Sequence, residues 1–569
     1  MKHCPECNRN YADGTLSFCL EDGAPLIYGE AVDDPETAIL HETDASGNAP
    51  TRTQLHATDQ TDILPSTNAG SDQAVSSPRK LVLLGVGVLG LLAVGLAAHV
   101  YLSQSQVRQV SSVAVMPFVN ENGDPQLEYL TDGMTETLIR SLYELPNIKV
   151  KARTSVFRYK GKEFDPKAIG KELGVQAIVN GRVGQRDGRT NVSIEVVDTE
   201  NEDVIFSTSY DKPQAELVTL QSEIARDVSG KLARKLSGSD EAKVSKTYTT
   251  DPEAYQLYLK GKFFWNKRGH DNLLQATDYF YRAIEKDPNF ALAYGGLALT
   301  YALYPDYNVA SPADSYPKSY AAARRALELD ATLAEPHTAL GNFYFLWKWD
   351  YVRAEQEFRR AIELNPSDAT AHHWLSAGVL VSLKRFDEAL SEAKNAQDVD
   401  PLSPIVTVNL GDIYYYARRT DEAIDVYRQA EKLDPSFCVP FLALGNAHSA
   451  KGQYREAVSS FRRALELCSG EAYTKGLLAA ALARAGQRDE AVNLVKEVEQ
   501  QAKHEFVRSD ALVFPYIALD NKDEAFVWLE KMVDEHVVEA ILLGVDPLFD
   551  DLRSDPRFKA ISKRVNLPE

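Results

Sequence analysis

The heptapeptide RAIEKDP, residues 282–288, recurs in altered form along the second half of the chain. Each copy ends a helical run that carries an alanine, and most copies close on Asp-Pro or Asn-Pro. The others are RALELDA (325–331), RAIELNP (360–366), NAQDVDP (395–401), QAEKLDP (429–435) and RALELCS (463–469). Successive copies lie about 34 or 35 residues apart, with one longer step. This period, with proline after the helix, predicts a solenoid of paired helices.

Small residues recur at fixed places within each unit. Glycine recurs on the first helix, at Gly261, Gly341, Gly411 and Gly445. Alanine recurs on the second helix, at Ala276, Ala354, Ala389, Ala423, Ala457 and Ala491. Such residues let two helices approach closely. We expect an all-α superhelical solenoid of about eight repeats over residues 252–535, and a C-terminal cap over residues 536–569.

Residues 111–237 combine strand-like and helical patterns instead. SVAVMPF (112–118) is a buried-strand run, residues 128–145 have apolar side chains at helical spacing, and residues 176–198 form two strands joined by a turn at Arg186-Asp187-Gly188. These patterns predict one α/β domain of about 125 residues. Asp132-Gly133, near the start of its first helix, is interpreted as a cap or turn.

These two segments resemble known families. The repeats resemble tetratricopeptide repeat (TPR) proteins over about half the chain. Residues 111–237 resemble the TolB-like amino-terminal domain of bacterial proteins, through SVAVMPF, GDPQLEYLTDGMTETL, KARTSVFRYKGK and IGKELGVQAIVNGRV. The closing LRSDPRF (552–558) is similar to the end of such proteins, whereas Phe206 stands where the family usually has tryptophan. The resemblance implies a module that is usually fused behind a membrane helix and a cytoplasmic kinase, cyclase or DNA-binding domain.

A long apolar run precedes this domain. Residues 81–102, LVLLGVGVLGLLAVGLAAHVYL, would span roughly 33 Å as a helix, enough to cross a bilayer. We expect one transmembrane helix there. Arg79 and Lys80 favour a cytoplasmic N-terminus, which in a bacterium gives a single-pass inner-membrane protein with periplasmic TolB-like and TPR domains. Residues 27–78 lack helical or strand periodicity and predict a disordered linker.

The first 26 residues predict a zinc-ribbon-like head. Cys4 and Cys7 form a C-x-x-C pair, and Cys19 and Asp22 repeat the same gap. So short a unit cannot fold on apolar burial alone, so structural zinc would have to stabilise it. Zinc accepts a carboxylate oxygen beside thiolates, although His3 is a rival ligand. A metal-free tail and a redox dithiol are the alternatives.

The first helix of each repeat is expected to line an inner groove. By register, the groove positions are Asn342, Phe345, Trp374, Asp412, Tyr415 and Asn446. Asparagine and aspartate can bond an extended peptide backbone, and aromatic rings offer flat anchoring surface. The alternative is that the three aromatic residues form the core between repeats.

Composition and motifs argue against other functions. The net charge of −20 argues against a nucleic-acid surface, and five cysteines are too few for a disulfide framework. Cys438 and Cys468 are interpreted as buried or free thiols. His372-His373 has no acidic partner at useful spacing, and no hydrolase, metalloprotease or phosphate-loop motif occurs.

The sequence therefore predicts a non-catalytic membrane-anchored scaffold whose TPR groove binds a protein or peptide in the cell envelope. One alternative is a signal-transduction component whose head recruits a cytoplasmic kinase or transcription regulator. Another is an α/β domain that binds a nucleotide or another ligand.

Overall fold

The structure is a computed structural model that describes residues 110–568, apart from 146, 163, 234–236, 469–471 and 505–506. It also describes three two-residue strands near the N-terminus, β1 (Lys2–His3), β2 (Asn10–Tyr11) and β3 (Ile27–Tyr28). Strand β1 pairs antiparallel with both β2 and β3.

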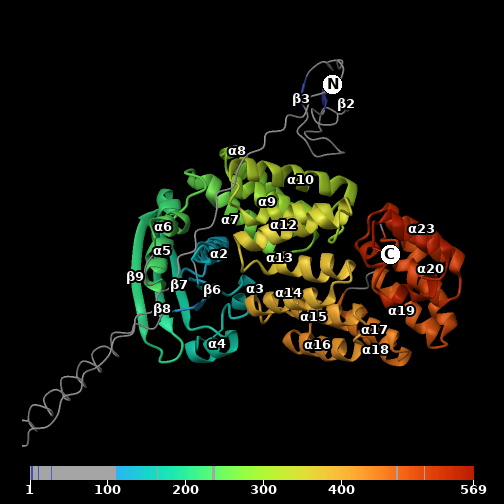
Figure 1. Ribbon diagram of the computed structural model, residues 1–569. Coiled ribbons are helices and arrows are strands. Elements are labelled where there is room, and N and C mark those ends of the chain that lie inside the picture. The colour runs from blue at the N-terminus through green and yellow to red at the C-terminus, as the bar shows by residue number, and fades with distance from the viewer. Residues whose placement is uncertain are drawn as a thin grey trace, which may run out of the picture. The chain divides into compact units, whose positions relative to one another are not determined.

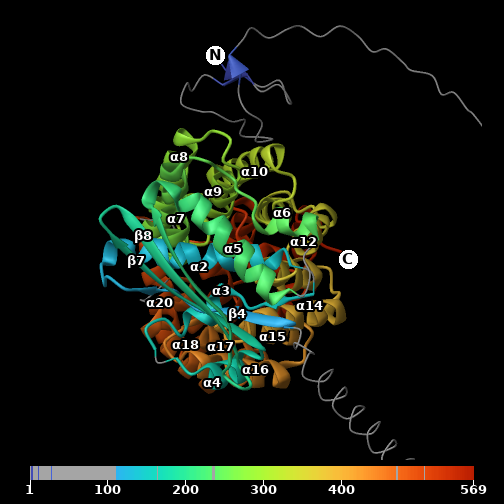
Figure 2. The same ribbon diagram turned by 90° about the vertical axis from the view of Figure 1, so that its left-hand side faces the viewer.

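A mixed sheet in the order β6-β4-β7-β8-β9 begins the main part of the structure, and Figure 2 labels its strands β4, β7 and β8. Strand β4 pairs in parallel with β6 and β7, and β7, β8 and β9 are antiparallel. Helices α2 and α5 pack against each other and against the sheet. The strands are β4 (Ser112–Val115), β5 (Val119–Asn120), β6 (Lys149–Val150), β7 (Ala177–Arg186), β8 (Arg189–Asp198) and β9 (Val204–Pro213). The helices are η1 (Pro125–Leu127), α2 (Glu128–Tyr143), α3 (Arg153–Phe157), α4 (Pro166–Leu173), η2 (Gln214–Glu216), α5 (Leu217–Leu232) and α6 (Gly238–Val244).

Local sequence explains the ends of several of these elements. Asp187 and Gly188, with φ of 51° and 72°, make the two-residue turn between β7 and β8, which requires positive φ at both positions. Asp165 caps α4 by accepting a hydrogen bond from the backbone N–H of Ala168, and Gly174 ends that helix with φ of 65°.

From Pro252 onward the chain is helical, and its helices pair (Figure 1). Two of the first helices of these pairs continue as π-helical segments, η3 and η4. The pairs are α7 (Pro252–Lys267) with α8 (His270–Lys286), α9 (Ala291–Leu303) with α10 (Pro312–Leu329), α11 (Ala334–Asn342) and η3 (Phe343–Trp347) with α12 (Tyr351–Leu364), α13 (Ala369–His373) and η4 (Trp374–Leu380) with α14 (Phe386–Val399), α15 (Pro404–Tyr416) with α16 (Thr420–Leu433), α17 (Val439–Ala450) with α18 (Tyr454–Leu467), α19 (Ala472–Arg484) with α20 (Arg488–Gln501), and α21 (Asp510–Ala518) with α22 (Lys522–Asp534). We number the pairs as repeats 1 to 8.

A glycine that faces an aromatic ring brings together the two helices of several repeats. A Cβ atom on Gly261 would lie 2.6 Å from the ring of Phe280. The same distance is 2.6 Å for Gly341 against Phe358, 2.4 Å for Gly411 against Tyr427 and 2.4 Å for Gly445 against Phe461. All four rings are buried. Only glycine permits this approach, so these positions set how closely the helices pack.

The sheet-containing region is attached to the solenoid at two places. Helix α2 packs on α7, where a Cβ atom on Gly133 would lie 2.8 Å from Leu259. The segment around α3 reaches the loop between α14 and α15: the Ser155 hydroxyl donates to the buried carboxylate of Asp400, 2.5 Å away. Arg158 also donates to the backbone carbonyl of Leu402, at 2.8 Å. The two regions therefore pack into one unit and are not joined by a linker alone.

The cysteines of repeat 6 are bonded to each other. Cys438 and Cys468 form a disulfide, with sulfur atoms 2.01 Å apart, between the residue before α17 and the residue after α18. This corrects the interpretation of both as thiols. No local motif marks this pair, because its two members lie before α17 and after α18 and meet only once these helices have packed.

The predicted inner-membrane localisation is contradicted. Within the part of the chain that the structure describes, no helix is both long and apolar enough to cross a bilayer. Helix α10 is 18 residues long but carries Asp314, Lys318, Arg324, Arg325 and Glu328. The more apolar α9 has 13 residues, about 20 Å, which is too short. Residues 81–102 lie outside the described residues.

The contact between glycine and aromatic ring can be tested in repeat 6. We expect Gly445→Ala to lower the free energy of unfolding by about 1–3 kcal/mol, because the new methyl group would overlap the ring of Phe461. Urea denaturation measures this loss, and a double-mutant cycle with Phe461→Leu should show that the two changes are not additive.

Gly230→Ala is the matched control. Gly230 lies on an exposed position of α5, with nothing within 4 Å of an added Cβ atom. We expect that change to be neutral or to stabilise the protein by up to about 1 kcal/mol. Equal losses from the two alanine substitutions would contradict the close contact in repeat 6.

Candidate partner-binding surface

The six residues predicted to line the groove all lie on the first helix of a repeat, but most of their surface is covered. Asn342, Phe345 and Tyr415 are buried, with 3%, 5% and 2% of their surfaces exposed. Trp374, Asp412 and Asn446 are partly buried. The ring of Phe345 packs edge-on against Tyr351, at 5.9 Å between centroids, and also fills the space beside Gly378 in the next repeat. Their role in binding a partner therefore stays a prediction.

The chain's own C-terminal segment, residues 536–568, covers part of this surface. It contains η5 (Val538–Leu542), η6 (Pro547–Leu552) and α23 (Pro556–Arg564). The Tyr351 hydroxyl donates to the backbone carbonyl of Val565 at 2.9 Å, and the Tyr415 hydroxyl donates to the carboxylate of Asp546 at 3.1 Å. Arg418 pairs with Asp550 through two hydrogen bonds of 2.8 Å. The segment thus reaches well back along the solenoid and contacts repeats 3 and 5.

Two carboxyl groups meet beneath this segment. Asp412 accepts a hydrogen bond from the hydroxyl of Tyr427 at 2.7 Å. Burial, together with the nearby charge of Asp546, raises the pKa of Asp412 to about 7. Burial also raises the pKa of Asp546 to about 6, against the hydrogen bonds that it accepts. Proton uptake therefore favours the contact between α15 and the C-terminal segment.

Asn446 lines a cavity of about 260 Å³ under η6. Arg418 and Asp550, which pair with each other, also line it. Among the described residues, the side-chain oxygen of Asn446 has no hydrogen-bond partner.

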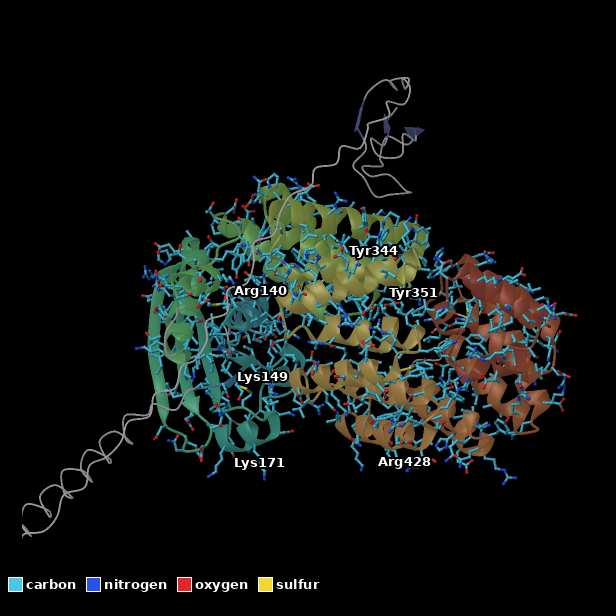
Figure 3. All side chains as sticks on the ribbon, viewed as in Figure 1. Arg140, Lys149, Lys171, Tyr344, Tyr351 and Arg428 are labelled. Carbon is cyan, nitrogen blue, oxygen red and sulfur yellow. A yellow bond between two sulfur atoms is a disulfide. The ribbon has the colours of Figure 1, made fainter. Side chains whose placement is uncertain are left out.

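A wide, open groove lies beside the helix turn of repeat 3. Its volume is about 670 Å³, and we call it the repeat-3 groove. It is lined by Tyr320, Phe343, Tyr344, Lys348, Trp349, Asp350, Tyr351, Val352, Arg353, Leu383, Asn566 and Pro568. Figure 3 labels Tyr344 and Tyr351, which flank this turn. Tyr320 lies 4.6 Å from Phe343 and 6.4 Å from Tyr344 between ring centroids, so these rings form one cluster.

The turn of repeat 3 has the left-handed backbone that recurs at this position along the solenoid. Trp349 has φ of 50°, Gly452 and Gly486 take the position in repeats 6 and 7, and Lys384, Arg418 and Asp520 take it in repeats 4, 5 and 8 with φ of 61°, 64° and 61°. A bulky residue pays about 1–2 kcal/mol for this conformation. The ring of Trp349 stacks on His536 of the C-terminal segment, at 4.1 Å between centroids and 16° between planes. This stacking offsets part of the backbone cost.

A second cavity, of about 320 Å³, lies where repeat 2 meets repeat 8. Residues 305–312 line one side, and Arg508 with residues 535–538 line the other. Burial raises the pKa of Asp306, which lines this cavity, to about 6. The position of this cavity shows that the solenoid curves far enough to bring its early and late repeats together.

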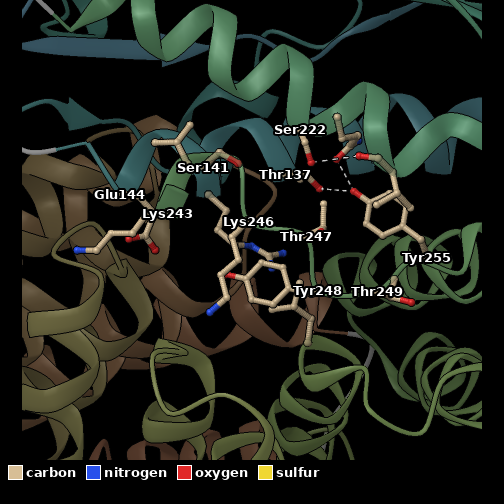
Figure 4. A pocket seen from close by; sticks show the side chains of 15 residues that line it. Thr137, Ser141, Glu144, Ser222, Lys243, Lys246, Thr247, Tyr248, Thr249 and Tyr255 are labelled. Atoms are coloured by element: carbon tan, nitrogen blue, oxygen red, sulfur yellow. Dashed lines mark hydrogen bonds between the residues drawn. The ribbon is translucent and has the colours of Figure 1, made fainter. Parts of the chain in front are cut away.

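The sheet-containing region has two hollows. An open one of about 470 Å³ lies over β7 and β8 and is lined by Arg182, Glu195 and Phe164 among others. A small one of about 40 Å³ lies between α2, α5 and α7, where the Tyr255 hydroxyl bonds Gln221 and Thr137 (Figure 4). The small hollow has room for a few water molecules at most.

Two interpretations of polar residues are corrected by long-range pairs. Asp132 is neither a cap nor a turn residue but lies inside α2, where its carboxylate accepts a hydrogen bond from Lys160 at 2.5 Å. His372 does have an acidic partner, because its Nδ1 lies 2.8 Å from the carboxylate of Glu392 on the following helix. The first pair ties α2 to the turn after α3, and the second joins the two helices of repeat 4.

The predicted metal ligands Cys4, Cys7, Cys19 and Asp22 lie outside the described residues, so zinc binding is untested. Of the residues that the structure does describe, no three His, Cys, Asp or Glu side chains cluster in a way that could hold a metal ion. The repeat-3 groove was missed at the sequence level. Its signal is FYFLWKWDY (343–351), in which six of nine residues are aromatic.

Comparisons with known proteins agree with the repeat architecture. A family model described as "TPR repeat" matches residues 411–452, and one described as "Tetratricopeptide repeat" matches residues 441–472. Putative adenylate cyclase 3 of Rhizobium meliloti is 29% identical over 231 residues, which are 40% of this chain and 39% of that protein. The chain therefore spans about two fifths of that relative's length.

Solved structures were also found. A chain of the APC/C hetero-tetramer Cut9–Hcn1 shares 14% identity at a TM-score of 0.38, over 62% of this chain and 63% of that one. PilW, titled a widely conserved type IV pilus biogenesis factor, shares 17% identity at a TM-score of 0.33, over 39% and 96%. The family matches, with the helix pairs described above, establish that the chain contains tetratricopeptide repeats.

The buried carboxyl of Asp412 predicts a pH dependence of stability. Its pKa is raised on folding, so its contribution is complete below about pH 4 and is lost as the pH rises through about 7. Asp412→Asn keeps the neutral form at all pH values. We therefore expect the loss of unfolding free energy between about pH 5 and pH 8 to be smaller in this variant, by on the order of 2 kcal/mol.

Urea denaturation at the two pH values measures this difference. Asp271→Asn, which changes a 90% exposed side chain, is the control and should leave the pH dependence as in the unaltered protein. Identical pH dependence in all three proteins would show that Asp412 is not neutral in the folded state.

Proposed function

We propose that this chain is a non-catalytic scaffold that binds a protein or peptide partner on its tetratricopeptide solenoid. The observation that supports this most directly is the repeat-3 groove. It is open to solvent and lined by aromatic rings, and such rings contribute a large share of the binding energy at protein interfaces. The C-terminal segment already covers part of the first-helix surface at repeats 3 and 5, so partner binding is directed to the surfaces that remain open.

The sheet-containing region is proposed to be a TolB-like domain. Contacts between the motif segments support this. The Thr135 hydroxyl accepts a hydrogen bond from the backbone N–H of Phe118 at 3.0 Å, and Asp132 pairs with Lys160. Three of the segments that carry the resemblance are therefore held together by side chains within those segments. The contact of α3 with Asp400 would let this domain sense changes in the solenoid.

A second candidate is a component of signal transduction. The likeness to a protein named as a putative adenylate cyclase, over 40% of this chain and 39% of that protein, supports it. Under this proposal the N-terminal head recruits a kinase or a transcription regulator. Pull-down with the full chain and with a Cys4→Ser variant separates the candidates: a signalling partner should be retrieved only by the unaltered head.

We also propose that Cys4, Cys7, Cys19 and Asp22 hold one structural zinc ion. Thiolates with one carboxylate suit tetrahedral zinc, and the pairing of β1 with β2 and β3 supports a small folded head. Zinc would supply the stability that so few apolar residues cannot.

Binding to the solenoid can be tested with the immobilised full chain and a display library of random peptides. We expect enriched peptides whose photo-cross-links fall within residues 252–568. Failure to enrich any peptide, or cross-links confined to residues 110–237, would refute the scaffold proposal.

Zinc content tests the head. We expect one zinc ion per chain in the unaltered protein and its loss in Cys7→Ser. Asp22→Ala should weaken zinc binding in a chelator competition, because three thiolates remain. His3→Ala is the comparison: if it weakens binding and Asp22→Ala does not, the histidine is the fourth ligand.

A further inference from the structure

We propose that the cavity between repeats 2 and 8 binds a small organic amine, whose ammonium group pairs with Asp306 and whose hydrocarbon body contacts the apolar wall. Such a site goes beyond the scaffold function, because its ligand is a small molecule and not a partner protein. The cavity has a volume of about 320 Å³. Pockets that hold small ligands commonly have volumes of about 300–1,000 Å³.

Three separate parts of the chain supply polar groups to this cavity. Asp306 lies in the loop between α9 and α10, Tyr316 lies near the start of α10, and Arg508 lies two residues before α21. The loop between α9 and α10 covers residues 304–311, whereas residues 417–419 are enough to join α15 to α16. The one longer step in the repeat period therefore supplies the loop that forms this wall.

The carboxylate of Asp306 is the uncompensated charge of this cavity. Its side chain keeps exposed surface and lines the cavity, and among the described residues it has no hydrogen bond or ion pair. Burial raises its pKa to about 6, although the charges of Arg508 and Arg268 act to lower it. A carboxylate whose pKa stays raised lacks a close counter-ion, and a bound ammonium group would supply one.

Arg508 does not fill this role, because its guanidinium is engaged elsewhere. It donates to the carboxylate of Asp510 at 2.6 and 3.3 Å, and it also donates to Glu539. Asp510 is fully buried, so this pair is held within the protein. Arg508 therefore offers the cavity no uncommitted positive charge, and an anionic ligand would meet Asp306 without compensation.

The other titratable groups that line the cavity also have partners. Glu535 lies 3.6 Å from Lys531 and accepts a hydrogen bond from the hydroxyl of Ser509. The Nδ1 atom of His536 lies 3.3 Å from the backbone carbonyl of Leu346, and burial lowers the pKa of this histidine, which favours the neutral ring. The unpaired charge of the cavity is therefore negative.

Tyr316 adds a hydroxyl beside this carboxylate. Its side chain lines the cavity, although only 2% of its surface is exposed. Within the described part of the chain, its hydroxyl forms no hydrogen bond. The charges of Asp306 and Arg508 both act on the pKa of this hydroxyl, which places it near them. A buried hydroxyl without a partner costs free energy, and an ammonium group has enough donors for both Tyr316 and Asp306.

Apolar side chains form much of the remaining wall. Val309, Ala310 and Pro312 contribute from repeat 2, and Val537 and Val538 contribute from the segment after α22. This wall suits a hydrocarbon body. One carboxylate is enough for an ammonium group, whereas a hard metal ion would need several oxygen ligands. The combination favours an amine with an apolar body.

The test uses the full chain and three probes of related shape: phenethylamine, the neutral phenethyl alcohol and the anionic phenylacetate. Isothermal titration calorimetry at about pH 8, where Asp306 is ionised, should show at least tenfold tighter binding of the amine than of the other two. Methylamine, which lacks the hydrocarbon body, should also bind at least tenfold more weakly than phenethylamine. Equal affinity for the three related probes, or no binding of phenethylamine, would overturn the proposal.

Variants locate the site. Asp306→Asn keeps the size of the side chain and removes its charge, so it should weaken binding of phenethylamine at least tenfold and change binding of the alcohol less than twofold. Tyr316→Phe should weaken amine binding about threefold. Ala310→Phe should fill part of the cavity and weaken binding of both probes. Asp271→Asn, which changes a 90% exposed side chain, is the charge control and should alter neither affinity.

Thermal unfolding without ligand checks that each variant folds. Unchanged amine affinity in folded Asp306→Asn would overturn the assignment. Tighter binding of a lysine-containing peptide than of phenethylamine would assign the cavity to a side chain of a partner protein, and would also overturn the small-ligand proposal.

Discussion

The close approach of a glycine to an aromatic ring is the constraint on which much of the structure depends. In repeats 1, 3, 5 and 6 the first helix offers a glycine, and the second helix offers a buried ring that fills the missing side chain's place. A small rotation from each repeat to the next adds up along the solenoid and brings repeat 2 against repeat 8.

The curvature of the solenoid determines which repeats the C-terminal segment contacts. A segment that follows repeat 8 can contact Tyr351 and Tyr415 only because the solenoid has turned back on itself. The segment supplies Asp546, whose pKa is raised by burial and whose charge helps to raise the pKa of Asp412 on α15. The sheet-containing region adds a second contact through Ser155 and Asp400. The middle repeats are therefore held both by the C-terminal segment and by the sheet-containing region.

The candidate groove follows from the same packing. Trp349 takes a left-handed turn position that recurs along the solenoid, and its ring stacks on His536 of the C-terminal segment. Lys348 and Arg353 lie beside the rings of Phe343 and Tyr344. The groove is thus built by residues from repeat 3 and from a segment almost two hundred residues later.

The sequence by itself determined the helical repeats, their small residues and the hairpin at Asp187-Gly188, because each leaves a periodic or local pattern of residues. The repeat register also assigned candidate groove positions, but it did not show how exposed those residues are. Only the tertiary structure decided the disulfide of Cys438 with Cys468, the pairs of Asp132 with Lys160 and of His372 with Glu392, and the cover over Tyr415. The physical reason is that the partners in these contacts come from different elements. Which elements meet depends on helix packing and on the accumulated curvature of the solenoid, which no local pattern of residues records.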